Sequence, residues 1–176
     1  FGTLDKIKID NMRLQHESII ERDAETADEP KPLADFGVVT ICSGDGLAEL
    51  FKSLGVTYVL SGGQTMNPST NDILDAIKAA HAKKVIVLPN NSNIFMAADA
   101  AAKEAPVEVA IVKSRTINQG LTSMLSYNPE RSLAENAAEM SEALSNVVSG
   151  QVTQSIRNST IDGLEIHEHD WIGLID

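Results

Sequence analysis

Small polar side chains in three loops are the residues of this chain whose types and spacing suggest binding chemistry. The loops are Ser43-Gly44-Asp45-Gly46, Ser61 to Pro68, and Asn90-Asn91-Ser92-Asn93, and each follows an apolar run. Paired glycines let the backbone turn and expose its N–H groups, and a serine that caps a helix marks a terminus of positive partial charge. These features suit an acceptor-rich group such as a carboxylate, phosphate or carbonyl. An ordinary turn between a strand and a helix has the same composition, so both interpretations remain open.

The three loops would meet at one edge of the sheet if the preceding strands are parallel. Arg115 and Thr116 follow a fourth apolar run and would join that edge as part of a hydrogen-bonding rim. Alternatively, the polar residues are helix caps, which favour the same side chains. The candidate residues for binding a partner or an anion are Ser43, Gly44, Asp45, Ser61, Gly62, Gly63, Gln64, Thr65, Asn67, Asn90, Asn91, Ser92 and Arg115.

Other chemistries find less support in the sequence. Neither glycine loop matches a dinucleotide-binding or Walker pattern. Cys42 ends an apolar run where a nucleophile could sit, but no histidine has a matching context, so we interpret it as a buried thiol. His167 and His169 would face one side of a strand, yet a metal site needs three or four converging ligands, and a solvated strand edge is the alternative. We therefore predict no catalytic residue and no metal ligand in this chain.

The elements that must position these loops alternate regularly. Four apolar runs predict strands that are buried between helices, and they span residues 37–42, 58–60, 84–89 and 107–112. Helical patterns follow them, one stopped by Gly55, one opened by Ser69, and one rich in alanine. The alternation predicts an α/β fold: a mainly parallel sheet of about four strands with helices on both faces.

The remaining third of the chain changes character. Residues 117–127 predict a helix, and Asn128-Pro129 predicts the start of a second one that carries Leu133 and Met140. After Gly150 the apolar residues alternate with polar ones, and Asp162-Gly163 is typical of a hairpin turn. This pattern predicts a small antiparallel sheet.

Composition bounds the organisation and excludes some functions. We divide the 176 residues into a short leading segment, 1–22, an acidic proline-bearing linker, 23–32, an α/β domain, 33–149, and an antiparallel β extension, 150–176. Both ends look cut, so we expect a piece of a longer protein. A net charge of −11 argues against nucleic acid as a partner and against an electrostatic membrane anchor. The single cysteine fits the cytoplasm, and no apolar run is long enough to insert into a membrane.

Several stretches together resemble a known family. They read LDKIKIDNMRLQH, VVTICSGDGLAELFKSLGV, VLSGGQTMNPST, VIVLPNNSNI and GQVTQSIRNSTIDGLEIHEHDWIGL. These are similar to the large subunit of bacterial fatty acid kinase, a dihydroxyacetone-kinase-like protein: the first to the end of its middle domain and the others to its C-terminal domain. The resemblance implies a fold shared with DegV-type lipid-binding proteins and with the dihydroxyacetone-binding subunit.

The resemblance also implies a function. The parent protein would be an ATP-dependent kinase that phosphorylates the carboxylate of a fatty acid while a DegV-like protein holds the acyl chain. The C-terminal domain would dock that partner, without catalysis of its own. ATP and magnesium would bind the N-terminal domain of the parent, which is absent here, and no cofactor is expected in this chain. A homodimer of the parent is a further possibility. The alternative is an enzyme or sensor domain of the same kinase-like family that binds a small anion or polyol at the loops.

Overall fold

The structure is a computed structural model that describes residues 32–62, 66–161 and 163–175. The chain divides into two units, Phe1–Pro32 and Leu33–Asp176. Everything below concerns the second unit. The predictions for residues 1–31 lie outside the described residues, so the predicted domain bounds stay predictions.

A four-stranded parallel sheet forms the centre of the described unit. The strands lie in the order β2-β1-β3-β4, and their bounds are β1 (Ala34–Cys42), β2 (Tyr58–Ser61), β3 (Ala82–Leu88) and β4 (Glu108–Ile111). The register aligns Thr40 of β1 with Val59 of β2 and with Leu88 of β3, so the carboxyl ends of these strands lie close together. The predicted parallel sheet is confirmed. However, Tyr58–Leu60 is only half-buried, because β2 is an edge strand.

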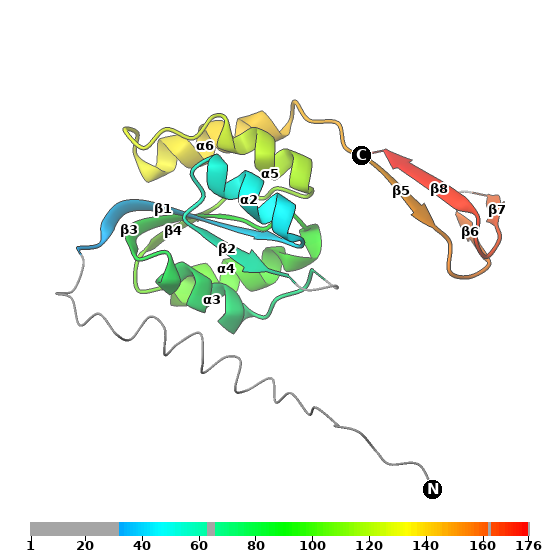
Figure 1. Cartoon of the computed structure of the whole chain (residues 1–176), viewed down its shortest axis with the longest axis horizontal. Helices are drawn as coiled ribbons and strands as arrows, with labels where there is room; N and C mark the ends of the chain where they lie inside the picture. The colour runs from blue at the N-terminus through cyan, green and yellow to red at the C-terminus, as the bar shows by residue number, and fades with distance from the viewer. Residues whose placement is uncertain (1–31, 63–65, 162, 176) are drawn as a thin grey trace, which may run out of the picture. The chain divides into compact units, whose positions relative to one another are not determined.

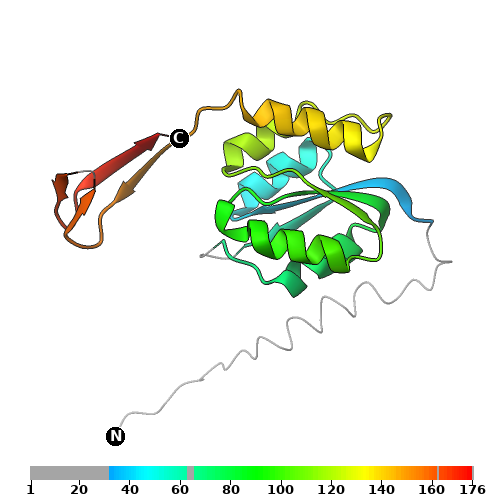
Figure 2. The ribbon, with the colours of Figure 1, turned by 180° about the vertical axis from the view of Figure 1, so that it is seen from behind.

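Helices cover both faces of the sheet, as predicted. One face carries α3 and α4, and the other carries α2, α5 and α6 (Figure 1), an arrangement that Figure 2 shows from behind. The bounds are α2 (Asp45–Ser53), α3 (Thr70–Ala79), the 3-10 turn η1 (Ser92–Ile94), α4 (Phe95–Glu104), α5 (Ile117–Met124) and α6 (Leu133–Leu144).

The hydrophobic core has two layers because neighbouring residues of a strand point to opposite faces. Val39 and Val87 pack on the face with α3 and α4, where Ile73 and Ala98 are also buried. Their neighbours Val38 and Ile86 belong to the other layer, with Phe51 of α2 and Met140 of α6. Strands buried on both faces explain the nearly continuous apolar runs of the sequence.

Two helices begin with reciprocal caps. Ser69 caps α3, and its hydroxyl accepts a hydrogen bond from the backbone N–H of Asp72, whose carboxylate accepts one from the backbone N–H of Ser69. Ser132 and Glu135 make the same arrangement at α6. The prediction that Asn128-Pro129 opens this helix is wrong.

Asn128 forms a turn instead of a helix cap. Its side-chain oxygen accepts a hydrogen bond from the N–H of Glu130 at 2.9 Å. The buried amide of Asn136 holds the turn, because its oxygen accepts from the N–H of Asn128 and its nitrogen donates to the Asn128 carbonyl, each at 2.8 Å. The helix can therefore start only beyond this turn, at Leu133.

The C-terminal extension is antiparallel, as predicted, but it consists of two separate strand pairs. β5 (Gly150–Gln154) pairs with β8 (Trp171–Ile175), and β6 (Ser159–Ile161) pairs with β7 (Leu164–Ile166). Gly163 has φ +83°, a conformation that suits glycine in a tight hairpin turn. Asp162, the other residue of the predicted turn, lies outside the described residues.

Candidate functional site

The loops that follow β1, β2 and β3 meet at the carboxyl edge of the sheet. We call residues 43–45, 61–67, 90–92 and 115 the polar rim. Met66 connects three parts of it: its sulfur accepts a hydrogen bond from the Ser43 hydroxyl at 3.0 Å, and its carbonyl accepts one from the Asn91 side chain at 3.4 Å. Gly62 lies against it, with its N–H bonded to the Cys42 carbonyl at 3.1 Å. The parallel strands therefore bring the predicted loops together.

Most candidate residues of the polar rim face solvent. Gly44, Asp45, Ser61, Asn67, Ser92 and Arg115 are exposed, whereas Ser43, Gly62 and Asn91 are half-buried. Gly63, Gln64 and Thr65 lie outside the described residues. Whether these residues bind a ligand or a partner stays a prediction.

Met66 is a residue of the rim that sequence reasoning missed. Its backbone takes φ +48°, an uncommon conformation for a residue with a side chain. A Cβ at Gly62 would lie only 2.8 Å from the Met66 sulfur and 3.0 Å from its Cα. Gly62 is thus a glycine because Met66 folds closely over it. An apolar residue inside a polar loop was the available signal.

Asn90 differs from the other candidates because it points into the protein. Only 4% of it is exposed, and its backbone has φ +57°. Its side-chain nitrogen donates to the Thr40 hydroxyl at 2.8 Å and to the Ile41 carbonyl at 2.9 Å. The Ser114 hydroxyl donates to its side-chain oxygen at 2.8 Å and accepts from its backbone N–H at 3.0 Å. Asn90 therefore supports the rim from beneath instead of contacting a ligand.

The turn after β4 is held by two polar side chains that sequence reasoning did not select. Gln119 accepts a hydrogen bond from the backbone N–H of Arg115 at 2.7 Å. Thr116 caps α5, accepting from the N–H of Gln119 at 3.2 Å, and its hydroxyl lies 2.7 Å from that of Ser149. The backbone of Arg115 is fixed in this way, while its guanidinium has no hydrogen bond or ion pair to any residue that the structure describes.

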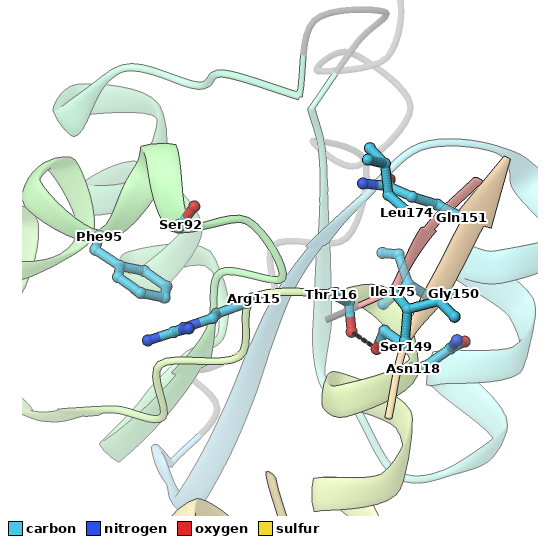
Figure 3. Close-up of a pocket in the computed structure, with 11 residues that line it drawn as sticks. Ser92, Phe95, Arg115, Thr116, Asn118, Ser149, Gly150, Gln151, Leu174 and Ile175 are labelled. Atoms are coloured by element: carbon cyan, nitrogen blue, oxygen red, sulfur yellow. Dashed lines mark hydrogen bonds between the residues drawn. The ribbon is translucent and has the colours of Figure 1, made fainter. Parts of the chain in front are cut away.

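A pocket of about 670 Å³ adjoins this turn (Figure 3). Its wall comes from the start of α4, from the turn after β4, and from the β5–β8 pair. In Figure 3, Arg115 and Phe95 lie on one side, and Thr116, Ser149 and Ile175 lie on the other. The lining residues are Ser92, Phe95, Arg115, Thr116, Ile117, Asn118, Ser149, Gly150, Gln151, Leu174 and Ile175. Arg115 is the charged residue among them.

Nucleophilic and metal chemistry have little support in the described part of the chain. Cys42 is 1% exposed, and burial raises the pKa of its thiol, which disfavours the reactive thiolate. His167 and His169 lie in the turn between β7 and β8 and not on a strand, so the prediction that they share a strand face is wrong. No group of three or more His, Cys, Asp or Glu residues within the described ranges could hold a metal ion. Within the same ranges, none of the helices has the length and apolarity needed to cross a membrane.

Comparison with known proteins gives a consistent result. Residues 37–176 match the model of the FakA-like family, which describes the C-terminal part of fatty acid kinase. Protein YloV of Bacillus subtilis strain 168 is 47% identical over 178 aligned residues, which cover all of this chain and 32% of YloV. An uncharacterized protein of Staphylococcus aureus strain USA300 is 40% identical over 176 residues, again across all of this chain and 32% of the relative. The chain thus spans about a third of the length of these curated relatives.

Proposed function

Since the chain belongs to the FakA-like C-terminal family of fatty acid kinase, we propose that it docks a DegV-like fatty-acid-binding protein. The bound acyl carboxylate would then reach the ATP- and magnesium-binding domain of the parent, which would phosphorylate it. In this proposal the chain contributes a surface and no catalytic group. The parent would act in the cytoplasm, where a single reduced cysteine is expected, and a homodimer of the parent would present two such surfaces.

The convergence of the loops at one sheet edge is the observation that carries this proposal. Ser43, Met66 and Asn91 come from three loops and contact one another, so the rim is a continuous surface. Exposed polar side chains surround this contact. A protein interface needs a preformed patch of about 800 Å² per partner, and loops tied to a rigid parallel sheet provide such a patch.

Calorimetry of the chain with a DegV-like fatty-acid-binding protein tests the proposal. Asp45→Arg places a long side chain of opposite charge in the rim, and we expect it to weaken binding at least about tenfold through clashes and unpaired charge. Glu104→Arg is the matched control: it makes the same charge change at the last residue of α4, which runs from the carboxyl edge back to the opposite edge. This variant should bind like the unmodified chain.

Two outcomes would refute docking at the rim. One is the absence of heat and of a co-eluting complex with a chain whose circular dichroism shows it folded. The other is equal weakening by Asp45→Arg and Glu104→Arg, because a general electrostatic effect on an acidic chain would then explain the result.

A further inference from the structure

The pocket beside Arg115 has the size and the mixed lining of a small-molecule site. Its volume of about 670 Å³ lies within the usual range of ligand pockets, about 300–1,000 Å³. Such sites combine apolar walls with a few polar groups that orient the ligand. Here the apolar walls include Phe95, Ile117, Leu174 and Ile175.

The charge of the lining is unusual for so acidic a chain. The net charge of the protein is −11, yet none of the lining residues is acidic and Arg115 is a cation. The neighbouring cation Lys113 lies 5.8 Å from the centre of the Phe95 ring, but its ammonium is paired with the Asp99 carboxylate at 2.9 Å. Arg115 has no such carboxylate partner among the described residues, so its guanidinium is available to a ligand.

A second donor is present on the opposite wall. The hydroxyls of Thr116 and Ser149 lie 2.7 Å apart, and one of them donates to the other. Each hydroxyl carries one hydrogen, so whichever donates within the pair, the other keeps a hydrogen for a further acceptor. The N–H of Gln119 already donates to the Thr116 oxygen, which fixes the position of the pair.

We propose that this pocket binds a monocarboxylate with an apolar chain. One guanidinium balances one carboxylate and can donate two parallel hydrogen bonds to it, while the apolar walls bury the chain. A phosphate ester or a nucleotide carries more negative charge than this lining offsets. A polyol would leave the apolar walls without a partner.

This site goes beyond docking at the polar rim, since it needs no partner protein. The two are also separable by experiment. A variant that loses the carboxylate and still binds the DegV-like protein would retain the docking function alone. A variant that loses the protein partner and still binds the carboxylate would retain the pocket alone.

Titration of the 176-residue chain with decanoate below its micelle-forming concentration tests the proposal. We expect saturable binding of decanoate, with shifts of the Thr116 and Gly150 amide resonances, and much weaker binding of acetate, which has the head group without the chain. Decanamide, which keeps the chain and loses the charge, should bind about tenfold more weakly than decanoate.

Substitution of Arg115 locates the charge. Arg115→Gln should weaken decanoate binding at least about tenfold, and Arg115→Lys should lie between this variant and the unmodified chain, because lysine lacks the planar pair of donors. Arg157→Gln is the matched control, since Arg157 is exposed and does not line the pocket. Absence of saturable binding to the folded chain would overturn the proposal. Equal affinity for Arg115→Gln and Arg157→Gln would also overturn it, because decanoate would then sit on apolar surface elsewhere.

Discussion

Replacement of Gly120 by alanine should destabilise the protein, although the same change usually stabilises a helix. Gly120 lies within α5, where alanine is favoured over glycine by about 1 kcal/mol. A Cβ at this position would come 2.0 Å from the side-chain oxygen of Asn90 and 2.9 Å from its Cγ. No heavy atoms approach so closely, so either the Asn90 amide or the helix must move.

The magnitude follows from what Asn90 would lose. A displaced amide would break its bonds to Thr40, to the Ile41 carbonyl and to Ser114, each contributing about 1 kcal/mol net. Overpacking adds about 1 kcal/mol or more. With about 1 kcal/mol of helix propensity offsetting these losses, we expect Gly120→Ala to lower the free energy of unfolding by about 3 kcal/mol. For a domain of this size that is about 8 °C in Tm.

Urea and thermal unfolding, followed by circular dichroism, measure this effect. Gly46→Ala is the matched control, because Gly46 also lies in a helix, α2, and nothing stands within 4 Å of its added Cβ. It should be neutral or stabilise by about 0.5 kcal/mol. A double-mutant cycle with Asn90→Gly adds a second check: without the amide, Gly120→Ala should no longer destabilise. Equal stabilisation by Gly120→Ala and Gly46→Ala would refute the reasoning.

Helix caps and the buried thiol give the remaining predictions. Ser69→Ala and Ser132→Ala should each lower the free energy of unfolding by about 1 kcal/mol at neutral pH in urea titrations. Hydrogen bonds from these serines lower the pKa of Asp72 and Glu135, so the caps stabilise most above the ordinary carboxyl pKa, and the loss in each variant should shrink as the pH falls through the lowered values. An undiminished loss in acid would contradict this. Burial raises the pKa of Cys42, so the folded state loses stability as the pH rises from the ordinary thiol pKa toward the raised one; a thiol reagent should modify Cys42 only on unfolding, and prompt modification of the folded chain would show that burial is wrong.

The strands and their direction could be predicted from the sequence because apolar runs alternate with helical patterns. The order β2-β1-β3-β4 could not, since no local pattern records which strands are neighbours. The start of α6 shows how two local signals compete. Asn128-Pro129 and Ser132 are both typical of helix starts, and the choice between them depends on Asn136, whose buried amide holds the earlier turn. That contact becomes visible only in three dimensions.

The candidate site was predictable as a set of loops but not side chain by side chain. Asn90 and Asn91 are identical neighbours, yet one is buried and the other lines the rim. The backbone conformation of Asn90, φ +57°, decides between them, and it depends on Thr40 and Ser114 from other strands. The pocket was beyond sequence reasoning for a related reason: it needs the turn at Arg115 beside the distant Ser149 and the β5–β8 pair.

The polar rim owes its shape to groups beneath it more than to the residues it exposes. Asn90 connects β1, the end of β3 and the turn after β4, and all its side-chain hydrogen-bonding atoms have protein partners. No buried side-chain nitrogen or oxygen lacks a partner in the described ranges, so the support is complete. Exposed rim residues such as Asp45 and Asn67 can then change without loss of the scaffold, since they contribute little to it. Binding and stability should therefore respond to different substitutions: those at the exposed rim change affinity, and those at Asn90 or Gly120 change folding.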